Sequence, residues 1–211
     1  MVVEKGNYEI HITVSEKDEY VFRQWCRSTG FKPIKAVSKR GVCPRQLMFS
    51  KFKYNTYQYV LDYTLSLRRE LIDLGIIVLR TKIEANIKNP IVPANEPHES
   101  NYYEFHFKPV TITDEDWDLI DRVCEDLSGT NWDVAYSFNT AKKDICPIVT
   151  VRAYRTTRKL ATEIKDNVFK HFKQHGIKVN DEIQREYSVY DDNQDLDKGW
   201  IMVASDLVPL D

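Results

Sequence analysis

Apolar and polar residues alternate strictly along residues 8–14. The apolar members are Ile10, Ile12 and Val14, and the polar members between them are Glu9, His11 and Thr13. A two-residue period is typical of a half-buried strand, because successive side chains point to opposite faces of a sheet. The pattern therefore predicts a strand with one face toward a hydrophobic core and one polar face.

The same pattern returns about 100 residues later as Tyr103-Glu104-Phe105-His106-Phe107-Lys108. Other landmarks recur with it. Cys26, Gly30, Cys43-Pro44 and Gly75 correspond in order to Cys124, Gly129, Cys146-Pro147 and Gly176. Solenoid repeats have periods of roughly 20–50 residues, so a repeat of this length indicates two similar half-domains.

Each copy follows the order strand, helix, strand, strand, helix, strand. In the first copy the strands fall at 8–14, 34–38, 47–54 and 77–85, with helices ending at Gly30 and Gly75. In the second, strands fall at 132–139, 148–154 and 178–189, and helices at 114–127 and 157–175. The order βαββαβ is the ferredoxin-like motif. We therefore predict an α+β fold, a tandem duplication of a ferredoxin-like unit with antiparallel sheets and helices on one face.

Four segments follow from this organisation. The first repeat spans 1–88, a linker rich in proline and asparagine spans 89–101, and the second repeat spans 102–190. Residues 191–211 form an acidic tail, expected to be largely irregular. Its Asp191, Asn193, Asp195 and Asp197 have calcium-loop spacing, but Leu196 and Met202 stand where an EF-hand needs glycine and glutamate, which rejects that motif.

Composition excludes several classes of protein. The chain has 211 residues, 42% of them hydrophobic, and a net charge of −2. No apolar run is long enough for a membrane span or a signal peptide, so we expect a cytoplasmic protein without a membrane partner. The charge disfavours nucleic acid as a partner. The four cysteines lack the spacing of a zinc ribbon, and Cys26 and Cys124 fit buried thiols on apolar helix faces.

Candidate chemistry lies on the polar sheet face. His11, His106 and Thr13 are the candidate catalytic residues, because histidine transfers protons near neutral pH. Cations that could hold a phosphate are Arg80, Lys82, Lys51, Lys53, Lys108 and Arg152. Glu9, Glu84 and Glu104 are the candidate metal ligands, with Mg²⁺ as the candidate cofactor. The alternative is that these residues form a solvated sheet face without a site. An exposed sheet face is normally polar and gains about 0.2–1 kcal/mol from each cross-strand ion pair.

Two short stretches resemble known families. His11-Ile12-Thr13-Val14 resembles the His-x-Thr-hydrophobic signature of the two-histidine phosphoesterases, which carry one such histidine in each half of a duplicated fold. Glu104-x-His106-x-Lys108 is similar to the Glu-x-Glu-x-Lys strand of the triphosphate tunnel (CYTH) enzymes. The first resemblance implies acid and base histidines acting on a phosphoester. The second implies inward arginine and lysine that bind triphosphate, with glutamates that hold Mg²⁺.

Two functions are therefore carried forward. The first is an enzyme that processes a phosphoester or polyphosphate ligand, a hydrolase with a phosphorylated small molecule as its substrate. The alternative is a non-catalytic binding module that uses the basic hairpin around Lys39-Arg40 or an exposed edge strand. The sequence leaves open whether the protein is an enzyme and how many copies assemble.

Overall fold

The computed structural model describes residues 4–95, 100–110, 114–141, 147–180 and 183–207, which form eight strands and four α-helices. The first half contains β1 (Gly6–Val14), α1 (Glu19–Thr29), β2 (Lys32–Ser38), β3 (Arg45–Asn55), α2 (Tyr57–Asp73) and β4 (Val78–Asn86). The second contains β5 (Tyr102–Phe107), α3 (Asp114–Glu125), β6 (Trp132–Asn139), β7 (Pro147–Tyr154), α4 (Arg158–Gln174) and β8 (Gln184–Asp191). The predicted α+β class with antiparallel strands is confirmed.

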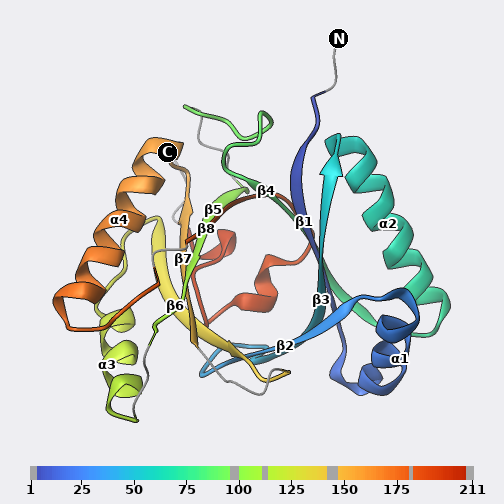
Figure 1. Cartoon of the computed structure of the whole chain (residues 1–211), viewed down its shortest axis with the longest axis horizontal. Coiled ribbons are helices and arrows are strands. Elements are labelled where there is room, and N and C mark those ends of the chain that lie inside the picture. Colours follow the sequence, from blue (N-terminus) through green and yellow to red (C-terminus); the bar gives the residue numbers. More distant parts are fainter. Residues whose placement is uncertain (1–3, 96–99, 111–113, 142–146, 181–182, 208–211) are drawn as a thin grey trace.

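All eight strands belong to one closed barrel in the order β1-β3-β2-β6-β7-β5-β8-β4. Within each half the order is that of a βαββαβ unit, β4-β1-β3-β2 and β8-β5-β7-β6. The halves join edge to edge through β2–β6 and β4–β8 (Figure 1). Every pairing is antiparallel, so β1 and β5, which are three steps apart through β4 and β8, run in opposite directions.

The helices cover the outside of the barrel, α1 and α2 on one flank and α3 and α4 on the other (Figure 1). The hydrophobic core lies between the helices and the outer faces of the strands. It includes Ile10, Ile12, Phe22, Phe49, Val151 and Phe172, all fully buried. The predicted alternation is thus confirmed, and the polar faces of the strands turn toward the barrel lumen.

The two long helices begin and end alike. Thr56 accepts a hydrogen bond from the Tyr59 N–H at 3.3 Å, and Thr157 accepts one from the Leu160 N–H at 3.2 Å. Such N-caps satisfy amide donors that have no partner within the helix. Gly75 follows α2 with φ +76°, a left-handed conformation that favours glycine. None of the described helices is long and apolar enough to cross a membrane.

The last strand differs from its prediction, because β8 is Gln184–Asp191 and not 178–189. Residues 178–180 pair instead with the chain that follows β5: Val179 forms an isolated bridge with Pro109, and Asn180 N–H donates to the Lys108 carbonyl at 2.8 Å. The landmark Cys146 falls outside the described residues.

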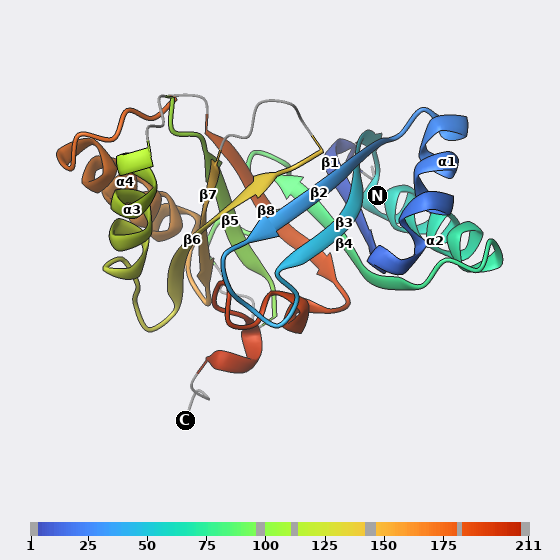
Figure 2. The ribbon, with the colours of Figure 1, turned by 90° about the horizontal axis from the view of Figure 1, so that it is seen from below.

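The described part of the acidic tail, residues 192–207, packs across one end of the barrel (Figure 2). It contains two short 3-10 helices, η2 (Gln194–Asp197) and η3 (Ala204–Asp206). The Val42 N–H donates to the Lys198 carbonyl at 2.9 Å, and Trp200 Nε1 donates to the Tyr136 carbonyl at 3.0 Å. Leu207 is buried in a small cluster with Tyr102 and Tyr154. These contacts tie the tail to both halves.

Candidate functional site

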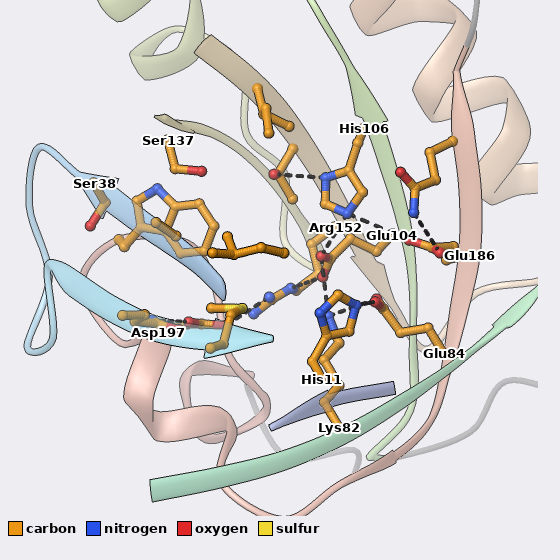
Figure 3. A pocket seen from close by; sticks show the side chains of 18 of the residues that line it. His11, Ser38, Lys82, Glu84, Glu104, His106, Ser137, Arg152, Glu186 and Asp197 are labelled. Atoms are coloured by element: carbon orange, nitrogen blue, oxygen red, sulfur yellow. Dashed lines mark hydrogen bonds and ion pairs between the residues drawn. The ribbon is translucent and has the colours of Figure 1, made fainter. Parts of the chain in front are cut away.

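The barrel lumen contains a cavity of about 630 Å³ to which both halves contribute (Figure 3). Its lining combines acids, bases and two histidines. The carboxylates are Glu9, Glu84, Glu104, Glu186 and Asp197; the lysines and arginines are Arg80, Lys82, Lys108 and Arg152; the histidines are His11 and His106. Ten of the twelve candidate residues named from the sequence therefore line this cavity, and the other two are Lys51 and Lys53.

His11 projects from β1 into the cavity and contacts two glutamates. Its Nε2 lies 2.9 Å from Glu84 Oε2 and 3.7 Å from Glu9 Oε1, and 18% of its side chain is exposed. Burial lowers the pKa of His11, but the contact with Glu84 and the negative charge of Glu9 outweigh burial, so the pKa is raised overall. His11 is therefore a proton-carrying group in contact with the cavity.

His106 occupies the matching place in the second half. His11 is registered with Ser50 of β3, and His106 with Thr150 of β7. The Nε2 atom of His106 lies 3.1 Å from Glu104 Oε1, Nδ1 lies 3.1 Å from Thr150 Oγ1, and 20% of the side chain is exposed. Both histidine rings thus point into one cavity, each beside a buried carboxylate (Figure 3).

Lys82 places its ammonium between carboxylates from both halves. Its Nζ lies 2.7 Å from Glu84 Oε1 and 3.2 Å from Glu104 Oε1. Burial raises the pKa of Glu84, but the positive charge of Lys82 outweighs burial and lowers that pKa to about 2. The same lysine, with Arg152, holds the pKa of buried Glu104 well below its usual value. Both carboxylates are therefore charged at neutral pH.

Arg80 and Arg152 share a carboxylate supplied by the tail. Asp197 Oδ2 accepts from Arg80 Nη1 and from Arg152 Nη2, both at 2.8 Å, and Oδ1 accepts from Gln46 Nε2 at 2.7 Å. Arg80 also pairs with Asp191. Sequence reasoning missed Asp197, because no local pattern shows that an acid in a polar tail will enter a lumen built by distant strands.

A second carboxyl pair lies beside His11. Gln184 Nε2 donates to Glu9 Oε2 and to Glu186 Oε1, both at 2.7 Å. Glu186 Oε2 is buried without a hydrogen bond. Burial, together with the charges of Glu84 and Glu9, raises the pKa of Glu186 well above its usual value. This carboxyl therefore favours its protonated form.

Three side chains could hold a metal ion. Ligand atoms of Glu84, Glu104 and His106 all lie within 4.8 Å of one another. Two carboxylates and an imidazole suit a divalent cation. Lys82 Nζ lies 2.7 Å from Glu84 Oε1 and 3.2 Å from Glu104 Oε1, so a cation bound there would replace the Lys82 ammonium. Glu9, the third predicted ligand, is outside this cluster.

Lys51 and Lys53 do not face the lumen, and their predicted place on the polar face is wrong. Lys51 Nζ lies 4.9 Å from the ring centre of Phe31, and Lys53 Nζ lies 4.1 Å from that of Tyr63 of α2. The reason is alternation along β3: Phe49 faces the core, so 51 and 53 share its side. The predicted basic hairpin is also neutralised in part, since Lys39 pairs with Asp121 and Arg40 with Glu125.

We compared the chain with protein families, curated proteins and solved structures. No family model matches the chain, and no curated protein matches it. Among solved structures, a mutant chlorite dismutase from Candidatus Nitrospira defluvii is 11% identical over 89% of this chain and 92% of its own, with a TM-score of 0.33. A second mutant of that enzyme is 14% identical over 92% and 94%, with a TM-score of 0.31. Likeness at this level supports no statement about the function of this chain.

Proposed function

We propose that the protein is an enzyme that acts on a phosphorylated small molecule inside the barrel. The observation that supports this is the convergence of His11 and His106, one from each half, in a single cavity with a carboxylate beside each ring. A solvated sheet face would instead spread these side chains over a flat surface.

The two histidines are the proposed acid and base. A positioned histidine contributes roughly 10²–10⁴ to a rate by proton transfer, and its partner carboxylate orients the ring. Glu84 has that role for His11 and Glu104 for His106. This division agrees with the resemblance to the two-histidine phosphoesterases, in which each half supplies one histidine.

A phosphate can bind in the lumen only where positive charge is not already neutralised by carboxylates. Arg80, Arg152 and Lys82 already pair with buried carboxylates, so they offer little net positive charge to a phosphate. A phosphate would therefore depend on protonated His11, on exposed Lys108, or on a divalent cation that accompanies the ligand. Glu84, Glu104 and His106 would hold such a cation, and Mg²⁺ would neutralise phosphate charge there.

We also infer that the halves arose by tandem duplication of a ferredoxin-like unit. Equal strand orders, equal helix caps and the matched pairs His11–Ser50 and His106–Thr150 support this. The proposed repeat boundaries at 88, 101 and 190 remain predictions. Superposition of Gly6–Asn86 on Tyr102–Asp191 tests the inference, and a failure to align both Glu-x-His strands would contradict it.

Thermal unfolding in the presence of ligands tests the proposed activity. Nucleotides, cyclic nucleotides, polyphosphate and short RNA would each be added with and without Mg²⁺. A ligand that binds only the folded state stabilises it by about 2.7 kcal/mol at a hundredfold excess over Kd. We expect a phosphorylated compound to raise the Tm and to be turned over.

Variants then separate catalysis from binding. His11→Ala and His106→Ala should each lower turnover by roughly 10²-fold or more; with Mg²⁺ present, His11→Ala should leave most of the binding, whereas His106→Ala should weaken its Mg²⁺-dependent part. His175→Ala is the control, because His175 is exposed at the end of α4. Binding without turnover of any compound would favour the alternative, a binding module. No Tm shift with any phosphorylated compound would reject the proposal.

A further inference from the structure

Two aromatic side chains stand uncovered on the lumen-facing side of β3. Phe52 is 67% exposed and Tyr54 is 65% exposed. Lys51 and Lys53 contact rings on the helix side, so the residues that alternate with them point to the opposite side. In the ladder with β1, Phe52 is paired with the cavity-lining Glu9. The two rings therefore continue the lumen surface beyond the cavity.

The neighbouring strand stops short of these residues. The pairing of β2 with β3 begins at Lys32 and Ser50, so β3 from residue 51 onward has β1 as its ladder partner on one side only. The rings lie at the rim of the barrel, at the end opposite to the one where Asp197 and Leu207 pack.

The second half shows what happens to the same positions when they are covered. His11 is registered with Ser50 and His106 with Thr150; two and four residues further on, Phe52 and Tyr54 correspond to Arg152 and Tyr154. Arg152 and Tyr154 are buried by the chain's own tail, with Leu207 against Tyr154. No described segment covers Phe52 and Tyr54 in the equivalent place.

We propose that Phe52 and Tyr54 form the binding surface for a planar ring of the ligand, so that the substrate class is a nucleotide. This inference rests on the proposed function, since it requires the phosphate to lie at the histidines. Aromatic side chains that present a flat exposed face bind bases by stacking, with little preference among bases.

The spacing along the strand fits such a ligand. Ser50 is level with His11, and a strand advances about 3.4 Å per residue. Phe52 then lies roughly 7 Å and Tyr54 roughly 14 Å further along β3. A ribose and its phosphates bridge a gap of this size between a stacked base and a reacting phosphate.

Equilibrium binding of a matched pair of probes tests the inference. Adenosine triphosphate carries the ring, and inorganic tripolyphosphate lacks it; both are titrated with Mg²⁺ into the full chain by calorimetry. We expect the wild type to bind the nucleotide more tightly. The double variant Phe52→Ala, Tyr54→Ala should lose roughly tenfold or more in affinity for the nucleotide and none for tripolyphosphate.

Tyr20→Ala is the matched control, because Tyr20 is 71% exposed on α1, outside the barrel. It should leave both affinities unchanged. Equal wild-type affinity for the two probes, or a double variant with unchanged nucleotide affinity, would overturn the ring site while the proposed function stands. If neither probe binds, the ring site is rejected, and the proposed function is rejected with it only if no other phosphorylated compound shifts the Tm. Sedimentation of the two proteins completes the test, since a dimer lost in the double variant would assign this surface to a second copy.

Discussion

Glu9 and Glu186 face the lumen and, among the described residues, neither forms an ion pair with lysine or arginine. Because the two carboxyl groups are close together, the free energy of unfolding should depend on pH. The pKa of Glu186 is raised, so the folded state holds this proton more tightly than the unfolded chain. The associated stability is present below the unfolded pKa and is lost as pH rises through the folded pKa. The lumen is therefore expected to become less stable toward alkaline pH.

Glu186→Gln removes that titration and keeps an oxygen to accept from Gln184. We expect its Tm at pH 8 to exceed that of the wild type by about 2–4 °C, which corresponds to ~1 kcal/mol in a chain of this size. At pH 5 the two proteins should be alike. Glu163→Gln on exposed α4 is the control and should follow the wild type. An equal loss of Tm at both pH values would show that Glu186 acts only through packing.

The cysteines give a second test of single residues. Cys26 and Cys124 are buried, and burial raises the pKa of Cys26 to about 11 and raises that of Cys124 further. Since the thiolate is the reactive form, neither should be labelled by a thiol reagent in the folded protein. Mass spectrometry of peptides after brief labelling would measure this. Modification of either one at the rate of an unfolded control would contradict the structure.

Alternation could predict most of the lumen from sequence, because a strand has a strict period of two. It placed His11, Lys82 and Glu104 correctly. It did not place Lys51, because β3 has large apolar residues on both faces, Phe49 on one and Phe52 on the other, so a period of two does not say which face meets the core. Asp197 was beyond reach for a different reason: its partners are set by tertiary structure alone.

Among the elements, the tail differs most from its prediction, because the sequence indicated an irregular segment and the structure shows it in contact with lumen residues. Its 3-10 helix η2 supplies a carboxylate to guanidinium groups from β4 and β7, and so links the two halves through charge as well as through packing. The strand and helix order, by contrast, followed from periodicity and caps, which are local properties.

Asp197→Ala should be strongly destabilising. Removal of one partner leaves Arg80 and Arg152 buried with less compensation, at a cost of roughly 3–5 kcal/mol. Because the pKa of Asp197 is lowered to about 2, this contribution is present above the unfolded pKa and is lost as pH falls toward 2. Urea unfolding at pH 7 measures the cost. Asp195→Ala, in the same 3-10 helix but exposed, should change stability by less than about 0.5 kcal/mol.

The whole molecule should unfold as one unit, because β2–β6 and β4–β8 close a single barrel. Proteins that keep only Trp25 or only Trp132, with phenylalanine at the other tryptophans, report separately on the first and second halves. We expect the two fluorescence transitions in urea to have the same midpoint once each variant is compared with its own circular dichroism. Two separate midpoints within one variant would show that the halves unfold independently.

Both halves of the barrel belong to one polypeptide, so a substitution in one half does not have to occur in the other, as it would in a symmetric dimer. In a dimer of identical half-barrels, each substitution would appear twice, related by the twofold axis. Here the two halves can differ at equivalent positions. Thr13 corresponds to Lys108, and Phe52 corresponds to Arg152. A ligand is rarely the same at both ends, and a lumen with two unlike sides can be selected to fit it.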